Sequence, residues 1–301
     1  MKIGIDIGGS HISVGVIDNK GRILCYDEHN FIEEEKIKLQ ESIIKNIINL
    51  IKNILNKSKI KIEQIDIIGI GSPGEIFKGK IKNAVNLNIH EFNIVEELKK
   101  YFNNKIIVKN DGVCAAVCEK EYGSLKKYDN CVFLCLGTGI GGACFLNGKL
   151  LKAGERIPFE IGHMIIKKDG KLCKCGNKGC FEEYASMRVL KNNIIKKFNL
   201  NRNVHGKNIL ELIKNEMDNP EIVNILNEYI KDLTIGIINI INLFEPEAIS
   251  IGGSFAYYKE VLHPLLVKEL QNSKTLRNYL PEIKIAQFGN EAGIIGSTCI
   301  V

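Results

Sequence analysis

The feature that most constrains the fold of this chain is a pattern that occurs twice, at starting points about 130 residues apart. Each copy consists of two apolar runs joined by a glycine-rich turn and followed by a second tight turn. The first copy comprises residues 2–7, 8–10, 12–17 and 19–21, and the second comprises residues 131–136, 137–142, 143–146 and 147–148. Strand, glycine turn and strand at this offset predict an internal duplication, in which the two glycine turns face each other across a cleft.

The remaining patterns predict a mixed α/β protein. Isoleucine and leucine recur at helical spacing over residues 36–55, and a long apolar helix is expected over residues 222–244. Residues 65–70 and 248–251 are short apolar runs that end in glycine loops, as buried strands commonly do.

Length and composition favour two lobes. The chain has 301 residues, of which 45% are hydrophobic and 25% charged, so it can bury a sizeable core and has the composition of a folded protein. We expect a smaller N-terminal lobe over residues 1–109, joined by the C-terminal segment 292–301. A larger lobe is expected over residues 110–291.

Three glycine loops follow predicted strands, at residues 8–10, 137–142 and 252–254. Ligands of open α/β sheets bind beyond the carboxyl ends of strands, and glycine lets the backbone approach phosphate oxygens closely. Residues 137–142 also fit the pattern G-x-G-x-x-G, but a strand and an Asn-Gly hairpin follow where a dinucleotide site requires a helix. We predict phosphate binding, with Asp6 holding Mg²⁺ and Ser10 adding a hydroxyl. The alternative is that these glycines serve only tight hairpins.

A cluster of metal-ligand types lies in the second half of the chain. His163, Cys173, Cys175 and Cys180 supply one imidazole and three thiols within eighteen residues. This donor set suits tetrahedral Zn²⁺, and four protein ligands leave no position for a catalytic water, so a structural site is predicted. The alternative is a chance cluster of thiols.

The charge pattern argues against a nucleic-acid partner. The formal net charge is +6, but the lysines are scattered and form no run of five or six. The basic segment over residues 167–178 could contact nucleic acid or a partner, yet it has no aromatic residues to stack on bases.

Targeting signals are not evident. The first thirty residues show no basic flank leading into an apolar stretch, and the longest apolar segment, residues 233–244, is too short for a membrane span. A cytoplasmic protein without a membrane partner is therefore expected. Its seven cysteines outside the metal cluster are expected to be reduced core residues: Cys25, Cys114, Cys118, Cys131, Cys135, Cys144 and Cys299.

Several motifs occur in one characteristic order along the chain. They are Asp6-Ile7-Gly8-Gly9-Ser10, Leu136-Gly137-Thr138-Gly139-Ile140-Gly141-Gly142, Glu160-Ile161-Gly162-His163, the run from Cys173 to Glu182, and the tail from Phe288 to Gly296. Together they resemble the ROK family, which joins sugar kinases with sugar-responsive repressors. The resemblance extends over essentially the whole chain, and its cysteine motif is the most specific part.

The resemblance implies an actin-like, duplicated ribonuclease-H-like fold with ATP between the lobes, in agreement with the duplication above. Repressor members carry an additional N-terminal helix-turn-helix domain, whereas the phosphate motif here begins at residue 6, so the kinase branch is expected. ATP, Mg²⁺ and structural Zn²⁺ are the expected cofactors. The residues expected to bind the nucleotide are Asp6, Gly8, Gly9, Ser10, His11, Gly137, Thr138, Gly139, Gly141, Gly252 and Gly253.

The resemblance also implies a base and a sugar site. Asp111 stands at the start of a predicted helix, where spacing alone favours a helix cap. The family's Asn-Asp motif implies instead that Asp111 is the general base and that Asn110 binds a neighbouring sugar hydroxyl. The other residues matching family sugar contacts are Asn86, Glu160, His163 and Glu182. In this scheme His163 binds Zn²⁺ through one ring nitrogen and faces the sugar with the other.

The motifs are compatible with either a hexose or an N-acylhexosamine as the substrate. Asn86 lacks the Pro-Gly pair usual in the family, residues 153–159 replace a small, glycine-rich stretch of glucose-type members, and His11 stands where many members have lysine. A homo-oligomer, a dimer, is expected. Loss of a metal ligand such as Cys175 is predicted to weaken sugar binding but to leave ATP affinity almost unchanged, because the glycine loops are distant. The alternatives are a non-catalytic sugar sensor and an actin-like hydrolase.

Overall fold

The computed structural model describes residues 1–84, 87–152, 159–273 and 279–299. It divides into two compact units. The first comprises Met1–Lys127, Leu150–Pro158 and Phe288–Val301, and the second comprises Tyr128–Lys149 and Phe159–Gln287. The first unit therefore continues beyond residue 109, where the predicted N-terminal lobe ends, and takes in the C-terminal segment.

The first unit is built on a five-stranded mixed sheet. Its strands are β1 (Lys2–Ile7), β2 (His11–Ile17), β3 (Ile23–Asn30), β4 (Ile67–Ser72) and β8 (Lys105–Asn110). Their spatial order is β3-β2-β1-β4-β8, with β2 antiparallel to both neighbours and β1, β4 and β8 mutually parallel. Asp6 pairs with Gly71 and Ser72 pairs with Asn110, so the carboxyl ends of the three parallel strands meet at one edge.

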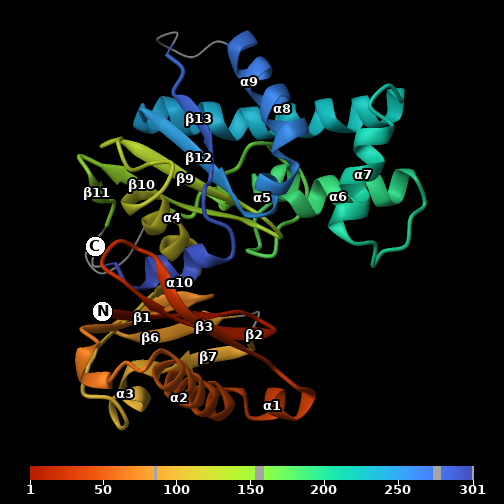
Figure 1. Ribbon diagram of the computed structural model, residues 1–301. Coiled ribbons are helices and arrows are strands. Elements are labelled where there is room, and N and C mark those ends of the chain that lie inside the picture. Colours follow the sequence, from red (N-terminus) through yellow and green to blue (C-terminus); the bar gives the residue numbers. More distant parts are fainter. Residues whose placement is uncertain (85–86, 153–158, 274–278, 300–301) are drawn as a thin grey trace. The chain divides into compact units, whose positions relative to one another are not determined.

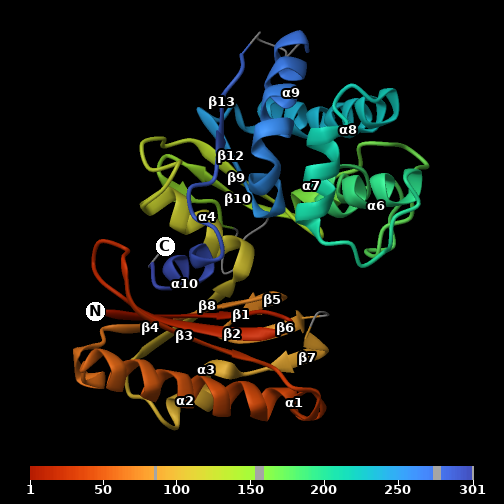
Figure 2. The same cartoon turned by 45° about the vertical axis from the view of Figure 1, so that its right-hand side comes forward.

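Helices cover both faces of this sheet, and Figure 2 shows α2 and α10 on opposite sides of it. The helices of the unit are α1 (Glu33–Ile37), α2 (Leu39–Ser58), η1 (Ile62–Gln64), α3 (Ile94–Lys99), α4 (Asp111–Glu121) and α10 (Glu291–Ser297). A small antiparallel sheet of β5 (Glu75–Phe77), β6 (Lys80–Ala84) and β7 (Ile89–Phe92) belongs to the same unit. Helix α2 buries Ile43, Ile47 and Ile51, which recur every four residues and form one face of the helix.

Helix α10 packs directly against the strands because two strand positions are glycine. A Cβ on Gly4 would overlap the carbonyl oxygen of Ile294, and one on Gly69 would overlap that of Ser297. Lys109 holds the end of the helix, since its half-buried side chain donates to the carbonyl oxygens of Ser297, at 3.0 Å, and Cys299. A cation there satisfies carbonyls that the helix itself leaves unpaired.

The second unit repeats the topology of the first. Its strands are β9 (Cys131–Leu136), β10 (Ile140–Leu146), β11 (Lys149–Leu150), β12 (Ala248–Gly252) and β13 (Glu282–Ile285). The order β11-β10-β9-β12-β13 matches β3-β2-β1-β4-β8 strand for strand, with β9 and β10 antiparallel and β9, β12 and β13 parallel. The predicted internal duplication is therefore confirmed.

The second unit carries most of the helical chain (Figure 1). Its helices are η3 (Ile161–His163), α5 (Glu182–Ala185), α6 (Met187–Lys197), α7 (Gly206–Asn215), α8 (Pro220–Phe244), η4 (Gly253–Tyr258) and α9 (Lys259–Asn272). Helix α8 begins after Asn219, whose side chain caps the first turn, and it ends at Phe244, with Glu245 as its C-cap just before Pro246. No helix in the described part of the chain has the length and hydropathy needed to cross a membrane.

Candidate functional site

Two carboxylates lie at the carboxyl ends of parallel strands in the first unit. Asp6 is the penultimate residue of β1, and Asp111 begins α4 directly after β8. Glycines make room for the Asp6 carboxylate, since a Cβ on Gly71 would stand 3.2 Å from its Oδ1 and one on Gly293 would stand 2.6 Å from its Cγ. Burial and the negative charge of Asp111 raise the pKa of Asp6 to about 7. Such a carboxylate is well suited to a cation.

The start of α4 separates the roles of Asn110 and Asp111. Asn110 is the helix cap: its Oδ1 accepts from the N–H groups of Gly112, at 2.9 Å, and Val113, at 3.3 Å, and its Nδ2 donates to the Gly74 carbonyl at 3.0 Å. Asp111 is solvent-accessible, yet loss of hydration around it raises its pKa. The cap that spacing suggested for Asp111 therefore falls to its neighbour, Asn110.

The first glycine turn is closed by His11. The N–H of Gly8 donates to the His11 carbonyl at 2.9 Å, and a Cβ on Gly8 would stand 3.2 Å from the His11 ring. Ser10 Oγ lies 3.3 Å from His11 Nδ1. The imidazole therefore covers one side of the turn, while Gly9 and Ser10 remain exposed.

The second glycine turn lies at the carboxyl end of β9, beside the loop after β12. Gly137 and Gly141 face open space, because no atom lies within 4 Å of the place where a Cβ would stand on either. Gly253 has a φ of +68° and packs so closely that a Cβ there would stand 2.7 Å from the Leu136 carbonyl oxygen. The structure thus brings together the expected nucleotide residues of this unit: Gly137, Thr138, Gly139, Gly141, Gly252 and Gly253.

Glu182, expected to bind sugar, is hydrogen-bonded to this turn. Its Oε2 accepts from the backbone N–H of Ile140 at 2.9 Å, and a Cβ on Gly139 would overlap the carboxylate. The expectation that the metal segment lies far from the glycine loops is therefore wrong for the second turn, because sequence separation does not report the contact between β10 and α5.

Arg188 is a residue that the sequence reasoning missed. Its Nε donates to the Thr138 carbonyl at 3.0 Å, its backbone N–H donates to the Gly137 carbonyl at 3.2 Å, and its Nη2 pairs with Glu183 at 2.9 Å. The only sequence signal was an arginine six residues after Glu182, in a lysine-rich chain.

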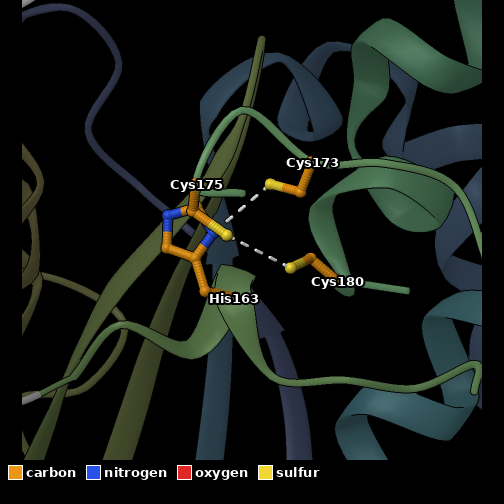
Figure 3. A group of neighbouring side chains, drawn as sticks. All are labelled: His163, Cys173, Cys175 and Cys180. Carbon is orange, nitrogen blue, oxygen red and sulfur yellow. Dashed lines mark hydrogen bonds between the residues drawn. The ribbon is translucent and has the colours of Figure 1, made fainter. Parts of the chain in front are cut away.

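The four predicted metal ligands converge in the second unit (Figure 3). Their ligand atoms all lie within 4.8 Å of one another, with Cys173 and Cys180 buried and Cys175 exposed. Gly176 and Gly179 have φ values of +91° and +86°, which turn the chain back on itself so that Cys180 returns to the Cys173 side.

The donor separations fit a tetrahedral zinc ion. With Zn–S of about 2.3 Å and Zn–N of about 2.0 Å, a sulfur and a nitrogen ligand stand about 3.5 Å apart and two sulfurs about 3.8 Å apart. His163 Nδ1 lies 3.6 Å from Cys173 Sγ, and Cys175 Sγ lies 3.6 Å from Cys180 Sγ. Burial raises the pKa of Cys180 to about 12, and the N–H of Asn177 lowers that of Cys175. Binding through Nδ1 leaves His163 Nε2 for another partner.

Two expected sugar residues remain. Glu160 precedes η3 and is exposed, and its carbonyl accepts from the His163 N–H at 3.0 Å. The η3 turn packs closely on β10, since a Cβ on Gly162 would overlap the Ile140 carbonyl oxygen. Asn86 lies outside the described residues. The described candidates thus form one group in each unit.

A model of the ROK family matches residues 2–301. The chain belongs to the ROK family. It is 28% identical to the glucokinase of Thermotoga maritima, over 99% of this chain and 96% of that protein. The xylose repressor of Bacillus spizizenii is also 28% identical, over 99% of this chain but 76% of the repressor.

A solved structure of a relative agrees in fold. The ROK glucokinase from Streptomyces griseus, in complex with glucose and AMPPNP, matches 99% of this chain and 97% of its own, with a TM-score of 0.81 and 25% identity. The predicted α/β fold of duplicated, actin-like type is therefore confirmed for this ROK protein.

Proposed function

We propose that this ROK protein is an ATP-dependent sugar kinase that phosphorylates a hydroxyl of a hexose or an N-acylhexosamine. Its likeness to glucokinases over nearly their whole length supports a sugar kinase. The observation that carries the proposal is the pair Asp6 and Asp111, two carboxylates with raised pKa values at the carboxyl ends of β1 and β8, the parallel strands on either side of β4. We further propose a cytoplasmic homodimer with no nucleic-acid partner.

Asp111 is the general base of this proposal. Transfer to an alcohol needs a carboxylate that accepts the hydroxyl proton as the oxygen attacks phosphorus. Asn110 caps α4, so Asp111 does not serve as the cap. The Gly112 N–H donates to Asp111 Oδ1 at 2.8 Å, which orients the carboxylate. A raised pKa makes the carboxylate a better proton acceptor.

Asp6 and the glycine turns are assigned to the nucleotide. Asp6 would hold Mg²⁺, directly or through water, and the ion when bound neutralises charge on the phosphates. The open faces of Gly137 and Gly141 let phosphate oxygens approach the backbone. Ser10 adds a hydroxyl from the first turn.

The sugar is assigned to acidic and imidazole groups of the second unit. We assign hydroxyl contacts to Glu160, to His163 Nε2 and to Glu182 Oε1, the carboxylate oxygen that does not accept from Ile140. We also assign contacts with sugar hydroxyls to Asn86 and Asn110. Structural Zn²⁺ at the four-residue cluster would fix the direction of the His163 ring.

Sugar-dependent ADP release tests this function. We expect turnover with at least one of glucose, mannose, fructose, allose, N-acetylglucosamine and N-acetylmannosamine, measured by a coupled assay with ATP and Mg²⁺. Absence of turnover with all of them would overturn the proposal.

A non-catalytic sugar sensor is the second candidate, and the likeness to a xylose repressor favours it. Calorimetric titration separates the two. Sugar binding without ADP release or phosphoryl transfer supports the sensor, whereas binding with transfer supports the kinase.

A further inference from the structure

The metal cluster and the second glycine turn are joined by a short, rigid segment. Helix α5 begins two residues after Cys180, and the N–H of Glu183 donates to the Cys180 carbonyl at 3.0 Å. Phe181, between them, is fully buried with its ring against Gly236 of α8, where a Cβ would overlap it. The placement of Cys180 therefore decides where the side chains of α5 stand.

Glu182 connects α5 to one end of the turn formed by residues 137–140, the phosphate turn. Its Oε2 accepts the Ile140 N–H at 2.9 Å, and Gly139 leaves the space that the carboxylate occupies. A hydrogen bond from an N–H group to an ionised carboxylate is stronger than one between neutral groups. Residue 140 is thus held by α5 as well as by its own strand.

Glu183 and Arg188 connect α5 to the other end of the phosphate turn. The two side chains are mostly shielded, with exposed fractions of 13% and 32%, and they form an ion pair at 2.9 Å. The same guanidinium donates to the Thr138 carbonyl at 3.0 Å, while the Arg188 N–H donates to the Gly137 carbonyl. Two of the three residues before Ile140 therefore have their carbonyl groups fixed by one arginine.

We propose that Glu182, Glu183 and Arg188 are positioning residues that couple the metal cluster to the phosphate turn. The turn then has its nucleotide-binding shape only when the segment from His163 to Cys180 is ordered by metal. The inference rests on the proposed function, because it assigns the turn to the nucleotide. Coupling between two binding sites is reciprocal, so metal and nucleotide each strengthen the binding of the other.

Metal removal is the first test. AMPPNP with Mg²⁺ is titrated into the zinc-loaded protein and into protein stripped by a chelator. We expect the nucleotide Kd to rise about tenfold on stripping and to recover when Zn²⁺ is restored. Hydrogen exchange over residues 137–140 should accelerate in the stripped protein, a readout that does not depend on activity.

Arg188→Gln is the second test, since it breaks the link and leaves the four metal ligands in place. We expect stoichiometric zinc, a nucleotide Kd raised about tenfold and faster exchange over residues 137–140. Glu183→Gln should act in the same direction, and the double variant should lose little more than Arg188→Gln alone. Arg202→Gln removes the same charge from an exposed position and should change none of these quantities.

A conservative variant keeps the test decisive if Arg188→Gln does not fold. Arg188→Lys keeps the charge, but one ammonium cannot reproduce the fork that reaches both Thr138 and Glu183, so nucleotide affinity should still fall. If the unaltered protein, the stripped protein and both Arg188 variants all bind AMPPNP equally well, the proposed coupling is wrong, whereas the proposed function still stands. If the unaltered protein binds no AMPPNP, the proposed function fails together with the coupling.

Discussion

At the scale of single residues, the most informative finding is that Asn110 and Asp111 have different roles at the start of α4. The pattern Asn110-Asp111 allowed either residue to cap the helix or to touch a ligand. The structure gives the cap to Asn110, which uses both ends of its amide. The pKa of Asp111 stays raised by loss of hydration, although its carboxylate accepts from the Gly112 N–H and from the Asn110 side chain.

Asp111→Asn tests the base directly. The amide keeps the shape of the side chain but cannot take a proton, so we expect kcat to fall at least about a hundredfold while sugar and nucleotide affinities change little. Steady-state kinetics and separate titrations check this. Asn110→Ala is the matched comparison: it should lower the free energy of unfolding by about 1 kcal/mol through loss of the cap. A kcat near that of the unaltered protein in Asp111→Asn would remove Asp111 from the mechanism.

Asp6 predicts a pH-dependent stability. Its pKa is about 7 in the folded protein against an ordinary 3.8, so the fold favours the protonated form. This group therefore stabilises the fold most below about pH 4, and that contribution is lost as the pH rises toward 7. Asp6→Asn should raise the free energy of unfolding at pH 7.5 without Mg²⁺ by about 1–3 kcal/mol, and the gain should vanish near pH 4.

Denaturant unfolding at the two pH values measures this effect. Asp218→Asn, at an exposed carboxylate, serves as the control and should show no pH-dependent difference. Equal stability of Asp6→Asn and the unaltered protein at both pH values would contradict the account. Despite its gain in stability, Asp6→Asn should bind nucleotide in a manner independent of Mg²⁺.

At the scale of elements, the glycines are of two kinds. Some allow another backbone segment to pack against them, and others leave open space that a ligand could occupy. Gly69→Ala drives a methyl into the Ser297 carbonyl of α10, so we expect it to destabilise the fold by about 3 kcal/mol or more. Gly141→Ala meets open space and should leave stability within about 1 kcal/mol while weakening AMPPNP binding about tenfold or more. Thermal unfolding and titration of both variants check the pair. A stable Gly69→Ala, or a Gly141→Ala with normal nucleotide affinity, would contradict this division.

The metal segment makes a second prediction at this scale. Cys175→Ala should lose stoichiometric zinc and loosen residues 162–182, because ordering of the loop is linked to metal binding. Sugar affinity should fall through displacement of His163 and Glu182. Metal analysis and titration check it, and Cys25→Ala, at a half-buried cysteine of β3, should keep both zinc and sugar affinity. Stoichiometric zinc in Cys175→Ala would show the ligand assignment to be wrong.

At the scale of the whole molecule, local patterns predicted the architecture well. Apolar runs joined by Gly8-Gly9 and by residues 137–142 predicted two hairpins, and the sheets indeed share one topology. The hydrophobic period over residues 222–244 and the break at Pro246 predicted α8 closely. Such signals are local, so a single sequence carries them.

Contacts between segments that are distant in sequence could not be predicted from the sequence. The hydrogen bonds of Glu182 to Ile140 and of Arg188 to Thr138 join segments about forty and fifty residues apart, and no spacing rule links them. The packing of α10 on Gly4 and Gly69 likewise depends on tertiary structure, since glycine within a strand has several explanations. The donor cluster was accessible because its ligands are close in sequence.

The fate of the γ-phosphate tests the central claim most directly. With γ-labelled ATP, Mg²⁺ and the sugar that gives the fastest ADP release, we expect the label in a sugar phosphate at one label per ADP formed, and far less transfer with Asp111→Asn. Label released as inorganic phosphate regardless of sugar would indicate a hydrolase. Sugar binding with the label retained in ATP would indicate a sensor, and either result would contradict the assignment as a sugar kinase.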